Sequence, residues 1–189
     1  LETMVKGGGG PIPQENIVGW IEQICDALSY LHLQNPAIIH RDIKPANIKI
    51  TSQGKAVLVD FGIAKYLNPS SMTTHAAKAA SPGFSPPEQY SYESTDALSD
   101  IYSLGATMYY LCTGLIPPDA NQIISGMAEP PTPVHLLNPS ISPYISAVLD
   151  KAMQLRRDQR FTSAADFKAA LNPSKPRYPS SPTVQAPHP

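Results

Sequence analysis

The feature that most constrains this chain is the stretch from His40 to Asn47, which reads His-Arg-Asp-Ile-Lys-Pro-Ala-Asn. It contains a carboxylate at Asp42, an ammonium group at Lys44 and an amide at Asn47. These three side chains can converge only if the backbone between them forms a tight, fixed loop. Such a loop could hold together a general base, a cation for phosphate charge and a metal ligand.

A second acidic motif, Asp60-Phe61-Gly62, follows 18 residues after Asp42. Two short β-type runs lie between the motifs, at residues 48–50 and 56–59, and residues 52–55 have the composition of a turn. This spacing predicts a β-hairpin, because two short runs joined by a glycine-containing turn pair readily. A hairpin would bring the two acidic motifs side by side.

This order of motifs resembles the catalytic loop, the magnesium loop and the intervening hairpin of protein kinases. We use the name catalytic loop for residues 40–47. The Lys44-Pro45-Ala46-Asn47 variant is more similar to Ser/Thr kinases than to tyrosine kinases. The Ala46-Asn47-Ile48 run and the later Ser-Pro-Pro-Glu-Gln-Tyr run at residues 85–90 look most like bacterial members of the Ser/Thr family. The resemblance implies transfer of the ATP γ-phosphate to Ser or Thr hydroxyls of proteins, with ATP and Mg²⁺ as cofactors.

The resemblance also implies a role for each polar residue of the two motifs. Asp42 would accept or orient the proton of the substrate hydroxyl, and Lys44 would offset charge on the transferring phosphoryl group. Asn47 and Asp60 would hold Mg²⁺ through oxygen, the ligand that a hard cation prefers. His40 would have a packing and hydrogen-bonding role rather than act as a general base.

Residues 63–88 have little regular pattern and correspond to the activation segment of the family. Ser81 stands where the family usually has threonine, and its hydroxyl would bond to the catalytic aspartate and lysine. Thr73 and Thr74 are candidate phosphorylation sites, and Arg41 could pair with a phosphate there and order the segment. The alternative for both threonines is that they are ordinary loop hydroxyls.

Two further motifs predict structural support for the catalytic loop. Asp100 opens a helical run that resembles the central buried helix of the kinase large lobe, and its carboxylate would bond to backbone N–H groups of the catalytic loop. The alternative is a surface aspartate that caps a helix. Arg160 belongs to a run that resembles a late arginine motif of the family, and it would pair with Glu88 to anchor the activation segment.

Apolar periodicity predicts a mainly α fold, with short β-hairpins carrying the two acidic motifs, and the resemblance implies the α+β class of the kinase family. The clearest helix spans residues 14–34, where apolar side chains recur at three- and four-residue steps. Further helices are expected at residues 1–6, 97–115, 143–153 and 163–171. A connector interrupted by prolines is expected at residues 116–143.

The resemblance covers residues 1–172 and maps to the large lobe of a kinase domain, whereas residues 173–189 read as a Pro/Ser-rich disordered tail or linker. No glycine-rich nucleotide loop and no strand lysine precede residue 14, so the small lobe of the family is missing from this sequence. We therefore expect the isolated chain to be a fragment with little activity. The alternative is a non-catalytic half-kinase that acts as a binding or regulatory module, and the coding sequence upstream of Leu1 would discriminate between the two.

The composition argues against several other classes of protein. A formal net charge of −1 does not favour nucleic-acid binding, and no apolar run is long enough to span a membrane. Cys25 and Cys112 lie in apolar helical patterns and are expected to be reduced core thiols, which suits a cytoplasmic protein. The expected partners are ATP and a protein substrate with Ser or Thr, without nucleic acid and without membrane contact within this chain. The intact protein could still be tethered to a membrane through a segment beyond residue 189.

Overall fold

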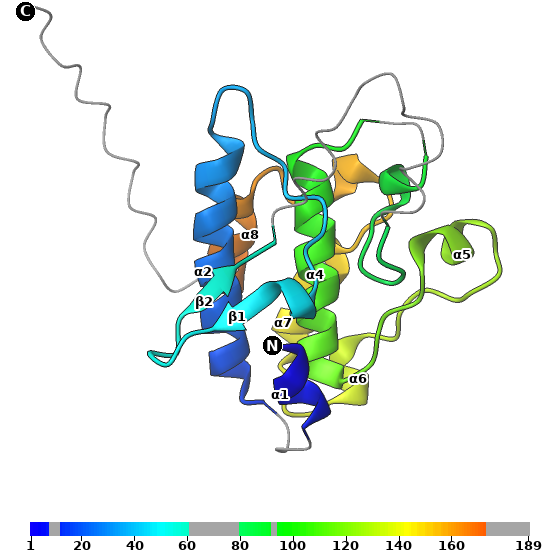
Figure 1. The fold of residues 1–189 in the computed structure, drawn as a ribbon. Helices are drawn as coiled ribbons and strands as arrows, with labels where there is room; N and C mark the ends of the chain where they lie inside the picture. The colour runs from blue at the N-terminus through cyan, green and yellow to red at the C-terminus, as the bar shows by residue number, and fades with distance from the viewer. Residues whose placement is uncertain (8–11, 61–79, 92–93, 173–189) are drawn as a thin grey trace, which may run out of the picture.

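The computed structural model describes residues 1–7, 12–60, 80–91 and 94–172, and these are mainly helical (Figure 1). The longer helices are α2 (Gln14–His32), α4 (Ala97–Thr113), α7 (Pro143–Ala152) and α8 (Ala164–Leu171). The shorter helices are α1 (Glu2–Lys6), α5 (Ala120–Ile124) and α6 (Val134–Leu137). One-turn 3₁₀ helices are η1 (Pro45–Asn47), η5 (Pro87–Gln89) and η6 (Arg157–Gln159), and the strands are β1 (Ile48–Ile50) and β2 (Ala56–Leu58). The predicted mainly α fold is confirmed.

Helix α4 is the central element of the core, as its sequence predicts. Every residue from Ser99 to Cys112 is buried, which is typical of a helix surrounded by other elements. Asp96 caps its N-terminus in a capping box with Ser99. A Cβ atom at Gly105 would lie 2.9 Å from the Cβ atom of Ala152, so this glycine permits the close approach of α4 and α7.

Helix α2 packs against α4, α8 and β2. Its buried side chains, which form the apolar stripe of the sequence, are Ile17, Ile21, Ile24, Cys25 and Leu28. The helix begins at Gln14 as predicted and ends at His32, two residues before the predicted boundary. It ends there because the carbonyl of Leu31 accepts hydrogen bonds from the N–H groups of Gln34 and Ile38 instead of continuing the helical pattern.

The predicted hairpin is present, with β1 and β2 paired antiparallel and Ile48 opposite Leu58. Both of these residues are buried in the core. The indole N–H of Trp20, on α2, donates to the carbonyl of Gly54 in the turn at 3.3 Å. The side chain of Gln23 accepts a hydrogen bond from the backbone N–H of Ala56 at 2.8 Å. These contacts hold the hairpin against α2 and so fix the positions of Asn47 and Val59, the residues at its two ends.

The C-terminal part of the described chain contains both predicted closing helices, α7 and α8. The predicted connector at residues 116–143 contains two short helices, α5 and α6, that the sequence pattern did not indicate. Cys25 and Cys112 are free and buried, and burial raises the pKa of both thiols, that of Cys112 to about 12. Among the described helices, none has the length and apolarity needed to cross a membrane.

Candidate active site

A buried carboxylate on α4 holds the start of the catalytic loop. Asp100 has 0% of its surface exposed, and its two oxygens accept hydrogen bonds from the backbone N–H groups of His40 and Arg41, each at 2.9 Å. Nε2 of His32 lies 2.9 Å from the same carboxylate. These bonds satisfy a group that would be costly to bury alone, and they are the bonds that the resemblance implies. The alternative, a surface capping residue, is wrong, because Asp96 caps the helix.

Arg41 has a backbone conformation that residues other than glycine rarely adopt, with a φ of 68°. A left-handed conformation costs such a residue about 1–2 kcal/mol, so neighbouring contacts have to hold it. Asp100 bonds to the N–H of Arg41, and Nε2 of Gln89 donates to its carbonyl at 2.6 Å. Sequence reasoning missed Gln89, because its partner is a backbone carbonyl 48 residues away and no side-chain pattern marks such a bond.

The ring of His40 joins the catalytic loop to the residue that precedes Asp60. His40 is 1% exposed, its Nδ1 accepts the backbone N–H of Asp42 at 3.3 Å, and its Nε2 lies 3.2 Å from the carbonyl of Val59. Because Nδ1 accepts, the proton of the neutral ring is on Nε2, which donates to Val59. Both ring nitrogens are therefore used within the protein, which supports a structural role for His40.

Three polar side chains converge around the carboxylate of Asp42. The hydroxyl of Ser81 donates to Oδ1 of Asp42 at 2.9 Å, and the ammonium group of Lys44 donates to the Ser81 hydroxyl at 3.0 Å. The same ammonium group lies 3.1 Å from Oδ2 of Asp42, and the amide nitrogen of Asn47 donates to Oδ2 at 3.0 Å. The side chains of Asp42 and Lys44 remain 23% and 30% exposed. A carboxylate held in this way is fixed in direction yet still open to a hydroxyl from solvent.

Asn47 and Asp60 each offer a side-chain oxygen that could bind a cation. The amide nitrogen of Asn47 also donates to the carbonyl of Asp42 at 2.8 Å, so the amide oxygen is the atom that could bind a cation. The backbone N–H of Val59 donates to the carbonyl of Asn47 at 2.9 Å, which puts Asp60 next to it, exposed and with a φ of 56°. In the described residues no cluster of three or more His, Cys, Asp or Glu could hold a metal alone. The pair suits Mg²⁺, which is usually held by one or two protein oxygens together with phosphates and water.

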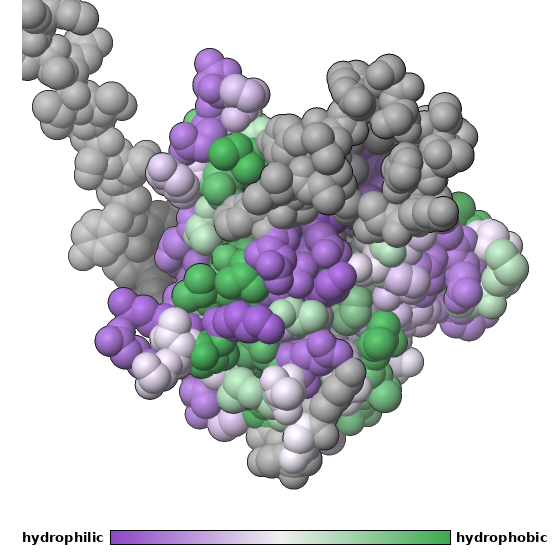
Figure 2. All heavy atoms as spheres, in the orientation of Figure 1, coloured by the Kyte–Doolittle hydropathy of each residue, from purple (hydrophilic) through white to green (hydrophobic). Residues whose placement is uncertain are grey.

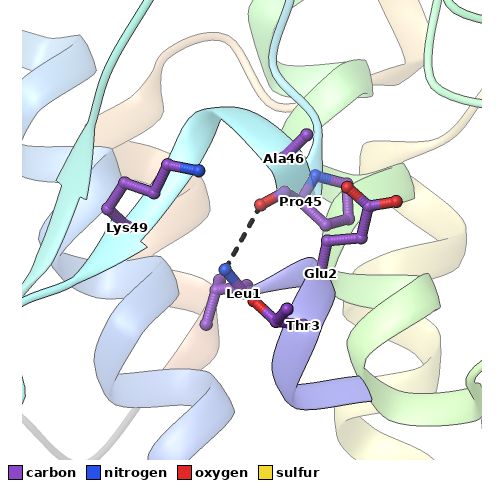
Figure 3. A pocket seen from close by; sticks show the side chains of 6 residues that line it. All are labelled: Leu1, Glu2, Thr3, Pro45, Ala46 and Lys49. Atoms are coloured by element: carbon purple, nitrogen blue, oxygen red, sulfur yellow. Dashed lines mark hydrogen bonds between the residues drawn. The ribbon is translucent and has the colours of Figure 1, made fainter. Parts of the chain in front are cut away.

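A cavity of about 370 Å³ adjoins the catalytic loop on the side of η1. Its lining, drawn in Figure 3, is Leu1, Glu2, Thr3, Pro45, Ala46 and Lys49. Pro45 and Ala46, which directly precede Asn47 in the chain, line this cavity. Figure 2 shows that hydrophilic residues gather in the centre of this face, over the catalytic loop, with apolar residues beside them.

Glu88 and Arg160 form a buried, bidentate ion pair, as the sequence implies. The two guanidinium nitrogens donate to the two carboxylate oxygens at 2.7 and 3.0 Å, and the residues are 4% and 3% exposed. Ser99 of α4 also donates to Glu88, at 2.8 Å. Burial by itself would raise the pKa of Glu88, but the hydrogen bonds and charge of Arg160 outweigh it and lower the pKa below its ordinary value. The pair ties η5 to α4 and to the loop before α8.

The structure brings ten of the sequence-predicted site residues into one connected region. Those outside the loop itself are Asp60, Ser81, Glu88, Asp100 and Arg160, and those inside it are His40, Arg41, Asp42, Lys44 and Asn47. Thr73 and Thr74 lie outside the described residues, as does the segment 173–189. Their interpretation stays a prediction.

Comparison with known proteins agrees with the geometry. The model of the protein kinase domain family matches residues 1–172. The serine/threonine-protein kinase PknB of Mycobacterium leprae is 36% identical over 167 residues, covering 86% of this chain and 26% of the relative. The serine/threonine-protein kinase Pkn1 of Myxococcus xanthus is 34% identical over 172 residues, covering 86% of this chain and 24% of the relative. The chain spans about a quarter of the length of these curated relatives.

The fold is similar to solved structures as well. The crystal structure of the PknI kinase domain of Mycobacterium tuberculosis matches with a TM-score of 0.69 and 27% sequence identity. The match covers 90% of this chain and 59% of that chain.

Proposed function

This chain belongs to the protein kinase family, and from that premise we propose that it forms the catalytic lobe of a Ser/Thr protein kinase. The proposed reaction transfers the γ-phosphate of ATP to a Ser or Thr hydroxyl of a protein substrate. The observation that carries the proposal is the convergence of Lys44, Ser81 and Asn47 on a partly exposed carboxylate, Asp42. A protein that does not catalyse phosphoryl transfer would have no physical need for this arrangement.

In the proposed mechanism Asp42 receives the proton of the substrate hydroxyl while that oxygen bonds to the γ-phosphorus and ADP leaves. Ser81 and Asn47 hold the carboxylate in one direction, so it meets the hydroxyl without reorganisation. Lys44, at 3.0 Å from the Ser81 hydroxyl, supplies positive charge where the phosphoryl oxygens would lie. Asn47 and Asp60 would hold Mg²⁺, which neutralises phosphate charge when it is bound.

The nucleotide has space on the η1 side of this site. The cavity in Figure 3 is lined by Pro45 and Ala46, which precede Asn47 in the chain, so a nucleotide whose phosphates reach Asn47 could extend into it. We place the reaction in the cytoplasm, where ATP is available and the buried thiols of Cys25 and Cys112 would stay reduced.

We also propose that Arg41 responds to phosphorylation of Thr73 or Thr74 by pairing with the added phosphate. The double variant Thr73→Ala with Thr74→Ala should then transfer phosphate more slowly than the wild type. Equal rates would overturn this part of the proposal.

Transfer of labelled phosphate from MgATP to a generic basic protein tests the main proposal. The protein should be expressed at the full length that its gene encodes, beside Asp42→Asn and a matched control, Asp26→Asn, which makes the same change at an exposed residue of α2. We expect transfer by the wild type and the control and a loss of at least about a hundredfold in Asp42→Asn. Absence of Asp42-dependent transfer would overturn the enzyme proposal in favour of a binding or regulatory module.

A further inference from the structure

The peptide group that links Arg41 to Asp42 is bonded at both of its polar atoms. Its carbonyl, on Arg41, accepts from Nε2 of Gln89 at 2.6 Å, and its N–H, on Asp42, donates to Nδ1 of His40 at 3.3 Å. A change in the ψ angle of Arg41 alone would move Asp42 relative to Arg41 and turn the carboxylate with it. Gln89 therefore acts on the direction of the proposed catalytic carboxylate without touching it.

The amide of Gln89 is buried at an energetic disadvantage. The residue is 6% exposed, and its Oε1 is buried without a hydrogen-bond partner among the residues that the structure describes. An unsatisfied buried oxygen is destabilising. The opposite amide orientation would bring this oxygen against the carbonyl oxygen of Arg41, and two acceptors cannot form a hydrogen bond. The amide is therefore oriented with Nε2 toward Arg41. An unbranched apolar side chain would fill the same space without this penalty. The position is nevertheless occupied by an amide, and the nitrogen of this amide bonds to the carbonyl of Arg41.

The one-turn helix that carries Gln89 is itself fixed to the core. The preceding residue, Glu88, bonds to Arg160 and to Ser99 of α4. The N–H of Gln89 donates to the carbonyl of Pro86 at 3.0 Å. The amide of Gln89 is consequently held relative to α4, the helix that also provides Asp100. Asp100 therefore holds the N–H of the strained residue Arg41, and Gln89 holds its carbonyl. Both groups are fixed to α4.

We propose that Gln89 is a positioning residue for phosphoryl transfer. By holding the carbonyl of Arg41 it keeps Arg41 in the left-handed conformation and sets the direction of the Asp42 carboxylate. This inference rests on the proposed function and adds to it a residue that contacts neither nucleotide nor substrate.

The test is Gln89→Met in the full-length protein, because methionine has the length and flexibility of glutamine but no donor. We expect kcat to fall about tenfold, with KM for ATP and for the protein substrate within about twofold of the wild type. The Tm should change little, since removal of the unsatisfied oxygen offsets the loss of the hydrogen bond to the carbonyl of Arg41. A residue with a merely structural role would lose stability and keep kcat per folded molecule. Unchanged kcat in Gln89→Met would overturn the inference.

Thr107→Val is a matched control. Thr107 is 0% exposed, and its hydroxyl is also buried without a hydrogen-bond partner in the described part of the chain. It lies on α4, about 10 Å along the helix axis from Asp100. The substitution removes the same kind of unsatisfied group and should leave kcat as it is. A fall in kcat as large as that of Gln89→Met would mean that the effect is not specific to the loop, and it would overturn the inference.

Amide hydrogen exchange gives a measurement that does not depend on activity. Exchange of the Arg41 and Asp42 amides should become about tenfold faster in Gln89→Met, while the interior of α4 keeps its protection. Unchanged exchange at these two amides would overturn the inference whatever the kinetics show. If the wild type has no Asp42-dependent transfer, the proposed function fails, and the exchange result still decides whether Gln89 holds this peptide group.

Discussion

Arg160→Met should strongly destabilise the fold, because it leaves the carboxylate of Glu88 buried without its main partner. Breaking a buried ion pair by removing one member costs about 3–5 kcal/mol. Ser99 at 2.8 Å and Arg157 at 3.6 Å would still compensate part of the charge. Against this, three backbone carbonyls, those of Leu98, Gln154 and Leu155, lose the guanidinium as a donor. We therefore expect a loss near the middle of the range, about 4 kcal/mol.

The effect should depend on pH in a defined direction. In the wild type, burial acts to raise the pKa of Glu88, but Arg160 outweighs it and the pKa lies below its ordinary value. Ionised Glu88 therefore stabilises the fold above its unfolded pKa, and this contribution is lost as the pH falls through the lower folded pKa. Without Arg160 the effect of burial, which is the largest, is opposed only by the hydrogen bonds from Ser99 and the backbone and by the more distant Arg157, and the pKa of Glu88 rises. The destabilisation by Arg160→Met should consequently shrink as the pH falls and Glu88 takes up a proton.

Urea unfolding at pH 7 and pH 5, followed by the fluorescence of Trp20, the only tryptophan of the chain, measures both quantities. The double variant Glu88→Gln with Arg160→Met should be more stable than Arg160→Met alone, because no unpaired charge stays buried. A loss below about 1 kcal/mol, as for an exposed ion pair, and equal at both pH values, would refute the reasoning.

Three further measurements test the site and the core. Ser81→Ala should lower kcat about tenfold, since Asp42 loses a hydroxyl donor, and Ser81→Thr should restore it; equal kcat in both would contradict the network. Asn47→Ala should raise the Mg²⁺ concentration required for half-maximal transfer, and an unchanged requirement would remove Asn47 from the metal site. Cys25 and Cys112 should react with a thiol reagent only on unfolding, because burial raises the pKa of both thiols; rapid labelling of the native protein would speak against this packing.

The core helices could be predicted because each rests on a periodic pattern within its own segment. The stripe from Ile17 to Leu28 marks α2, and the apolar spacing from Ile101 to Leu111 marks α4, whose burial on all sides the resemblance implied. The partners of Asp100 and Arg160 could be anticipated too, because a charged residue in such a setting has to be paired. The resemblance to the kinase family indicated the partner of each residue, and burial is the physical reason that each residue needs a partner.

Other features left no readable pattern in the sequence. Helices α5 and α6 have five and four residues, too short for an apolar period to show. The bond from Gln89 to Arg41 joins a side chain to a backbone carbonyl, and any residue type at position 41 would offer that carbonyl. The left-handed backbone of Arg41 is equally invisible, because arginine has no preference for that conformation.

Two residues of the site with a left-handed backbone show why its chemistry depends on distant parts of the fold. Arg41, with a φ of 68°, would relax if released, at a gain of about 1–2 kcal/mol, whereas Asp60, with a φ of 56°, is of a type that adopts this conformation more readily. The bond from His40 to the carbonyl of Val59 connects the two loops in which they lie. Groups from α4 and η5 hold the backbone of Arg41. The backbone of Arg41, which leads into Asp42, is therefore set by side chains outside the proposed catalytic group, and activity should respond to the loss of the Gln89 bond before stability does.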